Sequence, residues 1–400
     1  MKDSTVQSVC GKLANGVPDK TTGNFYRPDY TGFYEGSGRF LSEPAENAAW
    51  SLGYASEKLT PAVAMGDVYV SGSDGKKRTL ESVPKPQFIR AVAVSDGSGR
   101  GAHVFASLDC AGLSNAEVKE IRLSLRETAD KYDLRSINLF ATGDPGGADT
   151  VGLWGDLPKA ALKNLIAVRS EKKAANAVSG VNSDCMEYLR YAAAKCIRTA
   201  VESMQTGSLC AGKTATGSIL RFTPDEGERC VFLSVQDAVL RIFETAPRAD
   251  VAGFTPVKPL LNVLLTPLLI PADNAALLLA AKLKFINNPL IKVSADDDVP
   301  GEYHYVTEAG IVQLGDGIFA AMIPTEGKSF GAGAVTQLLP GLTVIGLAND
   351  TLGLKHARHT LNGVWAKLPA DAGKRTQNEI NGALSRTAQK LTQERHAQNV

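Results

Sequence analysis

The chain has 400 residues, of which 44% are hydrophobic and 21% are charged, as in ordinary globular proteins. Its formal net charge of +1 excludes the broad basic surface that nucleic acids or anionic membranes require, so no nucleic-acid partner is expected. The length exceeds the usual size of a single core and predicts either one large α/β domain or two lobes.

The spacing of the cysteines and the length of the apolar runs indicate which metal sites, cellular locations and membrane segments to expect. The six cysteines include no C-x-x-C pair, which argues against a zinc ribbon or a redox motif. Residues 1–15 lack the apolar core of a signal peptide, so we expect a cytoplasmic protein or the mature form of an exported one. No uncharged apolar run reaches roughly 18 residues, so no transmembrane segment is predicted. The oligomeric state stays open.

Composition divides the chain into three regions. Residues 1–48 are rich in Gly, Ser, Asn, Tyr and Pro and predict an irregular N-terminal extension. Residues 49–355 carry the strand and helix patterns of an α/β domain. Residues 356–400 predict a polar, helical C-terminal tail with sparse apolar contacts at Ile380, Leu384 and Leu391.

The first predicted strands lie at residues 52–59, 88–94 and 102–108. The second and third are β-favouring runs separated by the turn Asp96-Gly97, which predicts a β-hairpin. Cys110 follows the third run and is expected to be a small buried apolar residue.

A helix is predicted to begin at Ser114. Glu117 follows three residues later, which is the capping-box spacing, and the pattern continues to about Tyr132. A strand at 136–140 comes next, and the order strand, helix, strand is typical of a parallel pair. We therefore expect an α/β fold with mixed, largely parallel sheets flanked by helices.

The second half of the domain predicts one long helix and further strands. Apolar residues recur at three- and four-residue steps over 184–204, which marks a helix with one buried face. The apolar run 257–286 is interrupted by prolines and favours core helices joined by proline turns over a lipid-facing surface. Strands are expected at 218–222, 230–235 and 342–347, with a hairpin over 308–323.

The glycine-rich turn at residues 141–155 is the most informative motif. It reads A-T-G-D-P-G-G-A-D-T-V-G-L-W-G and directly follows the strand at 136–140, where ligand-binding groups often lie. It resembles the zinc-site motif A-T-H-T-H-S-G-P-D-T-x-G-L-W-G of the neutral/alkaline (non-lysosomal) ceramidase family. At the two histidine positions of that motif, this chain has Gly143 and Pro145.

Other blocks extend the resemblance in the same order from Gly53 to Asp350. They are G-Y-A with T-P at 53–61, I-R-A-V-A-V at 89–94, S-L-D-C-A-G-L at 107–113, I-R at 121–122, L-G-D at 314–316, I-P-T-E at 323–326 and G-L-A-N-D at 346–350. The resemblance implies the fold of the ceramidase N-terminal domain. The immunoglobulin-like C-terminal domain of larger members is not expected, because residues 351–400 are too few for a sandwich of roughly 100 residues.

Family members hydrolyse the amide bond of N-acyl sphingoid lipids with one zinc ion, which activates water. The resemblance implies ligands at both turn histidines, at a later strand histidine near 234–240, at the glutamate matching Glu326, and at a tyrosine where Thr351 and Leu354 fall. Of these ligands, only Glu326 is retained, and Asp149 matches the aspartate that follows the turn. No cofactor is therefore expected, and zinc only if other residues rebuild the ligand set.

The candidate pocket implied by these blocks consists of Thr142, Gly143, Asp144, Asp149, Thr150, Glu326 and Asn349. Its carboxylates Asp144, Asp149 and Glu326 could instead hold Mg²⁺ or Ca²⁺ through oxygen ligands. Alternatively, Asp144 only forms the turn before Pro145 and Asp149 caps the following segment. No catalytic residue is assigned.

Short motifs of other enzyme classes lack the required context. Residues 327–331 match G-x-S-x-G, but a nucleophile elbow needs a strand that runs directly into the serine. Residues 207–214 match the P-loop pattern, yet they are expected to leave a helix and enter a strand, which is the reverse of a P-loop. His356 and His359 have no third ligand nearby in the sequence and are expected to be surface groups.

The sequence favours a ceramidase-like homologue that has lost zinc-dependent amide hydrolysis and retains a pocket for a small apolar, acyl or lipid-like ligand. Two alternatives stay open. One is a hydrolase of altered mechanism that cleaves an amide or ester bond with a carboxylate-bound metal. The other is a structural or assembly protein that reuses the fold. If the protein is active, cleavage of a C–N amide bond is the expected reaction.

Overall fold

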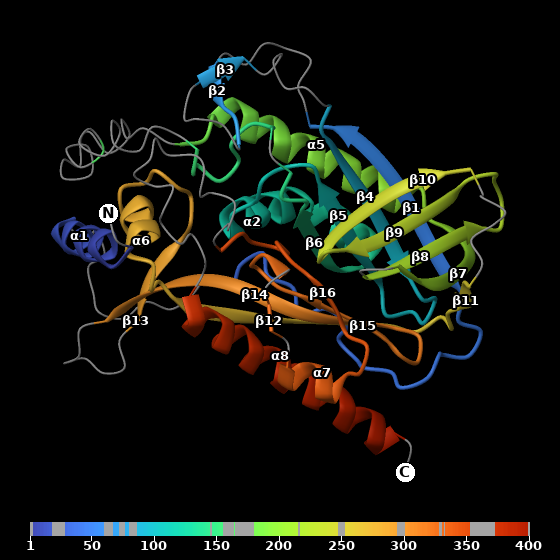
Figure 1. The fold of residues 1–400 in the computed structure, drawn as a ribbon. Coiled ribbons are helices and arrows are strands. Elements are labelled where there is room, and N and C mark those ends of the chain that lie inside the picture. Colours follow the sequence, from blue (N-terminus) through green and yellow to red (C-terminus); the bar gives the residue numbers. More distant parts are fainter. Residues whose placement is uncertain are drawn as a thin grey trace.

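Two β-sheets packed face to face form the centre of the fold, and helices cover the outer face of each sheet (Figure 1). This computed structural model describes residues 3–17, 29–59, 67–71, 77–79, 86–144, 146–154, 164, 180–214, 217–246, 253–293, 301–327, 330–331, 333–352 and 373–398. The layers are therefore helix, sheet, sheet and helix, with an apolar core at each of the three boundaries.

The larger sheet has nine strands in the order β10-β9-β8-β7-β1-β4-β5-β6, with β11 paired to β7. Its strands are β1 (Trp50–Lys58), β4 (Phe88–Ser95), β5 (Ala102–Leu108), β6 (Leu134–Ala141), β7 (Gln205–Thr214), β8 (Gly217–Pro224), β9 (Cys230–Gln236), β10 (Val239–Thr245) and β11 (Thr255–Pro256). The smaller sheet has five, in the order β12-β14-β15-β16 with β13 beside β14. They are β12 (Leu261–Pro271), β13 (Leu290–Val293), β14 (Glu302–Leu314), β15 (Ile318–Met322) and β16 (Thr343–Ile345). A separate ribbon joins β2 (Asp67–Tyr69) and β3 (Lys77–Thr79).

The sheets are mixed, and the expectation that they are largely parallel is wrong. Among the described strands, only β5 with β6 and β15 with β16 pair in parallel. The predicted strand–helix–strand unit is the first of these pairs. The other pairs are antiparallel. In the meander β7-β8-β9-β10, short turns connect consecutive strands and leave no room for a crossover.

Three helices cover the outer face of the larger sheet: α2 (Asn115–Ser124), α3 (Arg126–Tyr132) and α5 (Ser183–Glu202). The predicted capping box is present in part, since the Ser114 hydroxyl accepts a hydrogen bond from the Glu117 backbone N–H at 3.4 Å. The Asn182 side chain caps α5 in the same way. The apolar face predicted for this helix is buried at Met186, Leu189, Ala193, Ile197 and Val201.

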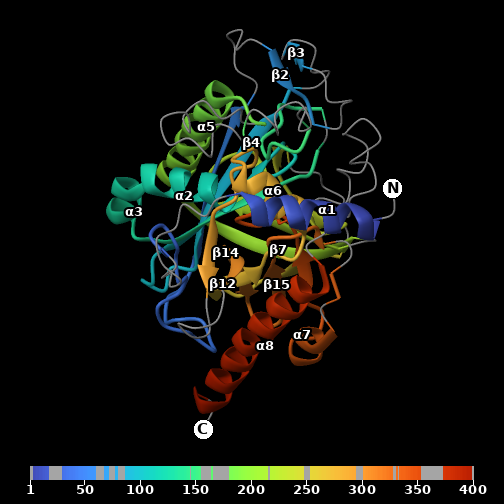
Figure 2. The same cartoon turned by 90° about the vertical axis from the view of Figure 1, so that its left-hand side faces the viewer.

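The outer face of the smaller sheet is covered by α7 (Gly333–Leu338) and α8 (Gly373–Gln398), which run side by side in Figure 2. The sparse apolar residues predicted for the tail, Ile380, Leu384 and Leu391, are all buried in this layer. The tail therefore packs on the domain through one narrow stripe while its other faces stay polar. None of the helices in the described part of the chain combines the length and apolar character of a membrane span.

Two segments differ from their predicted structure. The extension 1–48 was expected to be irregular, but it contains helix α1 (Asp3–Gly16), which packs on α6 (Ala275–Lys282). The apolar run 257–286 was expected to be helical, but its first part is β12 and only its second part is a helix. Prolines 267 and 271 fit this strand because β12 is the edge of its sheet, where a missing N–H costs least.

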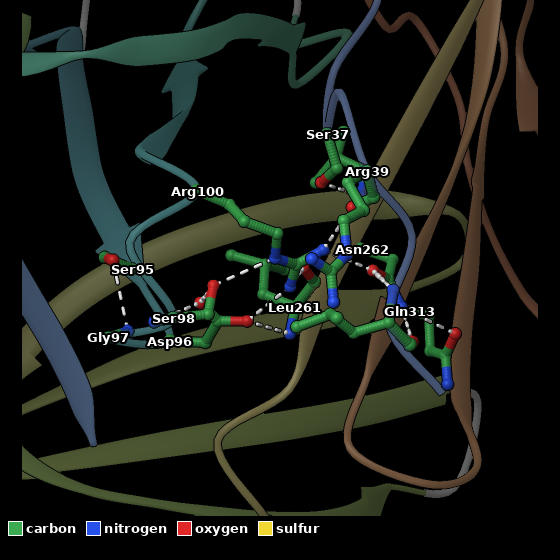
Figure 3. A network of polar contacts seen from close by, with 12 residues as sticks. Ser37, Arg39, Ser95, Asp96, Gly97, Ser98, Arg100, Leu261, Asn262 and Gln313 are labelled. Carbon is green, nitrogen blue, oxygen red and sulfur yellow. Dashed lines mark hydrogen bonds and ion pairs between the residues drawn. The ribbon is translucent and has the colours of Figure 1, made fainter. Parts of the chain in front are cut away.

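A buried polar network ties the β4–β5 turn to the start of β12 (Figure 3). The Arg100 guanidinium donates to the Asp96 carboxylate at 2.6 Å and to the Leu261 carbonyl and the Asn262 side chain, both at 2.7 Å. It also donates to the Arg39 carbonyl at 2.7 Å. Asp96 accepts in turn from the Leu261 N–H at 2.9 Å. The network joins the two sheets at this edge. The candidate site lies at the opposite end, where β6 terminates.

Candidate functional site

The glycine-rich turn begins where β6 ends. The Thr142 N–H donates to the Leu108 carbonyl at 2.9 Å, and the Gly143 N–H donates to the Cys110 carbonyl at 3.0 Å, so the turn is held against the end of β5. Gly143 has a φ of +71°, in the left-handed region that side chains other than glycine rarely adopt. The Thr142 hydroxyl is buried, and no hydrogen-bond partner for it lies among the described residues.

Backbone hydrogen bonds bring four separate segments together beside this turn. The Gly346 N–H donates to the Ala238 carbonyl at 2.8 Å, and the next N–H, of Leu347, donates to the Thr325 carbonyl at 2.9 Å. The Leu347 carbonyl accepts from Ala141 at 3.1 Å. We call this meeting point of residues 141–143, 236–239, 325–327 and 346–347 the turn junction. It contains three of the positions to which the family resemblance assigns zinc ligands: Gly143, part of the segment 234–240, and Glu326.

Glycine and aliphatic side chains fill much of the turn junction. A Cβ atom added to Gly143 would lie 3.4 Å from Cδ1 of the buried Leu347, so an aliphatic group faces the position where the first ligand would start. The segment 234–240, where the later strand histidine would fall, contains no histidine. Glu326 is half-buried in the turn junction. Across the described ranges, no three His, Cys, Asp or Glu side chains are grouped closely enough to hold a metal ion. Pro145 and Leu354 lie outside the described residues.

Asp149 holds the second half of the turn in place. Its buried carboxylate accepts backbone N–H groups from Val151 at 3.0 Å and from Gly152 and Trp154, both at 2.7 Å. Burial raises the pKa of Asp149 to about 6, although these amide hydrogen bonds oppose the shift. The neighbouring Thr150 hydroxyl donates to the Gly112 carbonyl at 2.6 Å. Both candidate residues therefore have structural partners.

Asn349 and Asp350 follow the smaller sheet and form hydrogen bonds with β6 and with the start of α2, respectively. Asn349 has a φ of +58° and pairs twice with Leu139 of β6, through its N–H at 2.7 Å and its side-chain oxygen at 2.8 Å. Asp350 is the last residue of the G-L-A-N-D block, and no sequence signal assigns it a role. Its buried carboxylate accepts from the N–H groups of Asn115 at 2.9 Å and Thr351 at 2.7 Å. Burial raises the pKa of Asp350 to about 7.

The described histidines do not contribute to the turn junction. His103 is buried between the hydroxyls of Ser136 at 2.8 Å and Ser37 at 3.3 Å, and burial lowers its pKa to about 3, so it stays neutral. His304 lies on β14, with Nδ1 3.0 Å from the Glu302 carbonyl oxygen. His356, His359, the side chain of His396 and the serine of the G-x-S-x-G match lie outside the described residues. The P-loop match is part of the regular strand β7, so it forms no phosphate loop.

An apolar cavity of about 70 Å³ lies between the two sheets. Its lining comes from strands of the larger sheet, including β8, β9 and β10, and from β14, β15 and β16 of the smaller sheet. Leucine, valine, isoleucine and phenylalanine side chains make up most of it, and Ser218 and Thr343 are its polar members. Their hydroxyl oxygens are 3.5 Å apart. Leu240 and Ile345 in its wall lie two residues along the chain from Ala238 and Leu347 of the turn junction.

Comparison with known proteins shows a likeness in fold but none in sequence. No family model matches the chain, and no curated protein sequence matches it. Among solved structures, it is similar to the neutral ceramidase from Pseudomonas aeruginosa, with a TM-score of 0.51, 12% identity, and coverage of 87% of this chain and 75% of that one. A ceramidase complexed with C2 aligns with a TM-score of 0.49 and 11% identity over 87% of this chain and 76% of that one. The first likeness shows a ceramidase-like fold, as the resemblance implied.

Proposed function

We propose that this chain is a ceramidase-like protein that has lost zinc-dependent amide hydrolysis and binds an apolar, acyl-chain-like ligand. The observation that carries the proposal is the cavity between the sheets, which is lined almost entirely by aliphatic and aromatic carbon. Each methylene group transferred from water into such surroundings contributes about 0.8 kcal/mol. The paired hydroxyls of Ser218 and Thr343 offer one polar contact for a carbonyl or carboxyl group at the end of the chain.

The composition of the turn junction supports the loss of hydrolysis. A zinc ion that activates water needs about three protein ligands besides the open position. Gly143 and Ala238 offer no donor atom, and Leu347 places a methyl group against the turn. A histidine at position 143 would also have to adopt the left-handed backbone conformation that glycine allows there. Glu326 and Asp237 are the carboxylates of the turn junction, and two such residues are fewer than a catalytic zinc centre needs.

The first prediction concerns ligand size. Ala320→Leu adds carbon to the cavity wall and should weaken binding of a dansyl-labelled fatty acid by about tenfold, since a filled cavity cannot accept the chain without strain. Leu233→Ala enlarges the same cavity and should shift the preference toward a fatty acid longer by about one or two methylenes. Fluorescence titration measures both effects.

The matched control is Leu123→Ala, which makes the same truncation on an exposed face of α2. It should leave the affinity and the chain-length preference unchanged. Absence of saturable fluorescence in the wild type would refute the ligand-binding proposal, and so would equal effects of all three substitutions. A defined oligomer in light scattering, with no lipid recovered by mass spectrometry, would favour the assembly role instead.

The second prediction concerns metal. We expect purified protein to contain far less than one zinc per chain by elemental analysis, because the described residues offer too few donors. Hydrolysis of amide and ester substrates should stay at background with added Zn²⁺, Mg²⁺, Ca²⁺ or Mn²⁺, and Glu326→Ala should not change it. Near-stoichiometric zinc, or metal-dependent turnover that Glu326→Ala removes, would restore the hydrolase alternative.

A further inference from the structure

The apolar cavity between the two sheets, here called the acyl cavity, has one polar end. Ser218 and Thr343 lie there, with their hydroxyl oxygens 3.5 Å apart. The rest of the described lining is apolar and contains no acidic or basic side chain. An occupant with an apolar tail and a single polar head matches this distribution, with its head at the Ser218 end.

Strand β7 brings a lysine to this polar end. In the register of β7 and β8, Lys213 is directly opposite Ser218, so the two side chains leave the sheet on the same face. Alternation along β7 agrees, because Leu209, four residues earlier, lines the cavity. The Cβ atoms of opposite residues are about 5 Å apart, which is within reach of a lysine side chain. Lys213 is exposed and is not part of the lining, so we place its ammonium group at the rim of the cavity.

The charges at this rim favour an anionic head group. Within the described ranges, no hydrogen bond or ion pair engages the ammonium group of Lys213. Asp316 lies in the turn between two lining residues, Leu314 and Ile318, but it pairs with Lys258 at 2.9 Å. A carboxylate beside Ser218 would accept hydrogen bonds from hydroxyls and from the ammonium group, and charge-assisted hydrogen bonds are the stronger kind. A neutral head group would gain no charge partner there.

We propose that the acyl cavity binds an ionised medium-chain carboxylic acid whose carboxylate is held at the rim by Lys213 and by the hydroxyls of Ser218 and Thr343. This inference rests on the proposed acyl-binding function and adds the identity of the head group. The cavity offers about 70 Å³ to the centres of water-sized groups, which is room for about five to seven of them. Octanoate matches this space, because about six of its carbons fill the cavity while the carboxylate and the adjacent carbon stay at the rim.

The first test compares octanoate with 1-octanol by isothermal titration calorimetry of the full chain, at low and at high concentrations of sodium chloride. Octanoate should bind about tenfold more tightly than 1-octanol at low salt, and salt should reduce this ratio because it screens an ion pair at an exposed rim. Equal affinities, or a ratio that salt does not change, would overturn the carboxylate inference and leave the acyl-binding function intact. Binding of neither compound would overturn both proposals.

A substitution at the rim provides the second test. Lys213→Met removes the charge but keeps an unbranched side chain, and it should weaken octanoate binding by about tenfold without changing 1-octanol binding. Lys213→Arg should retain the preference for octanoate. The matched control, Lys390→Met, removes an exposed lysine from α8, on the outer side of the smaller sheet, and should affect neither ligand. If Lys213→Met leaves the preference for octanoate unchanged, the assignment of Lys213 is wrong.

Discussion

Arg122→Met is expected to lower the free energy of unfolding by about 3–5 kcal/mol, because it leaves a buried carboxylate without its partner. Arg122 and Glu308 form an ion pair of 2.5 Å in which both side chains are 0% exposed. The same guanidinium donates to the carbonyls of Ile137 at 2.9 Å and Gly32 at 3.2 Å. Arg122 thus connects α2 with β6, the edge strand of the larger sheet, and with β14 of the smaller sheet. Urea unfolding of both proteins measures the loss.

Two controls separate this effect from the simple removal of an arginine. Arg135→Met breaks an exposed ion pair with Asp133, whose side chains are 45% and 54% exposed, and should cost less than about 1 kcal/mol. The double variant Arg122→Met/Glu308→Leu removes both buried charges and should recover most of the lost stability. If the double variant is as unstable as Arg122→Met, the cost comes from packing and not from the unpaired Glu308.

Asp350→Asn is expected to make the protein more stable at pH 8 and to leave its stability unchanged near pH 4. The pKa of Asp350 is about 7 in the folded chain, against an ordinary value of 3.8. The folded state therefore binds the proton more tightly, and stability falls as the pH rises from 3.8 through 7. Asparagine avoids the buried charge, and its oxygen can still accept from Asn115 and Thr351. The gain at pH 8 should be on the order of 2–4 kcal/mol.

Thermal or urea unfolding of both proteins between pH 4 and pH 8 measures this prediction. The Asp350→Asn variant should still lose some stability as the pH rises, with a shallower slope than the wild type, because the pKa of Asp149 is also raised, to about 6. The matched control is Asp133→Asn on the surface, which should not change the slope. An equal loss of stability in Asp350→Asn at both pH values would show that the carboxylate itself is needed for its hydrogen bonds.

Local patterns predicted the elements whose structure depends on near neighbours in the chain. The capping residue Ser114, the buried face of α5 and the hairpins β4–β5 and β14–β15 all lie where spacing and turn residues indicated. The glycine turn was correctly placed at the end of a strand. Each of these features depends on a stretch of about ten to twenty residues, through its helical or alternating periodicity or through glycine in a turn.

Local sequence patterns do not predict which strands pair when the strands are far apart in the chain. One parallel unit, β5 with β6, suggested a largely parallel arrangement, but a single crossover says nothing about the other strands. The apolar run at 257–286 was ambiguous for the same reason, because its residues fit a buried strand or a buried helix equally. Its pairing with β14, and its place at the edge of the sheet, decided the outcome.

The absence of histidine at positions 143 and 145 can be seen without coordinates, so the turn offers no imidazole ligand at either position. Which groups surround the turn depends on the three-dimensional packing. It places Leu347 against Gly143, gives Asp149 and Asn349 backbone partners, and encloses an apolar cavity between two sheets. These arrangements join residues as far apart as 139 and 349, and such contacts depend on how whole sheets pack, which no local run of side chains encodes.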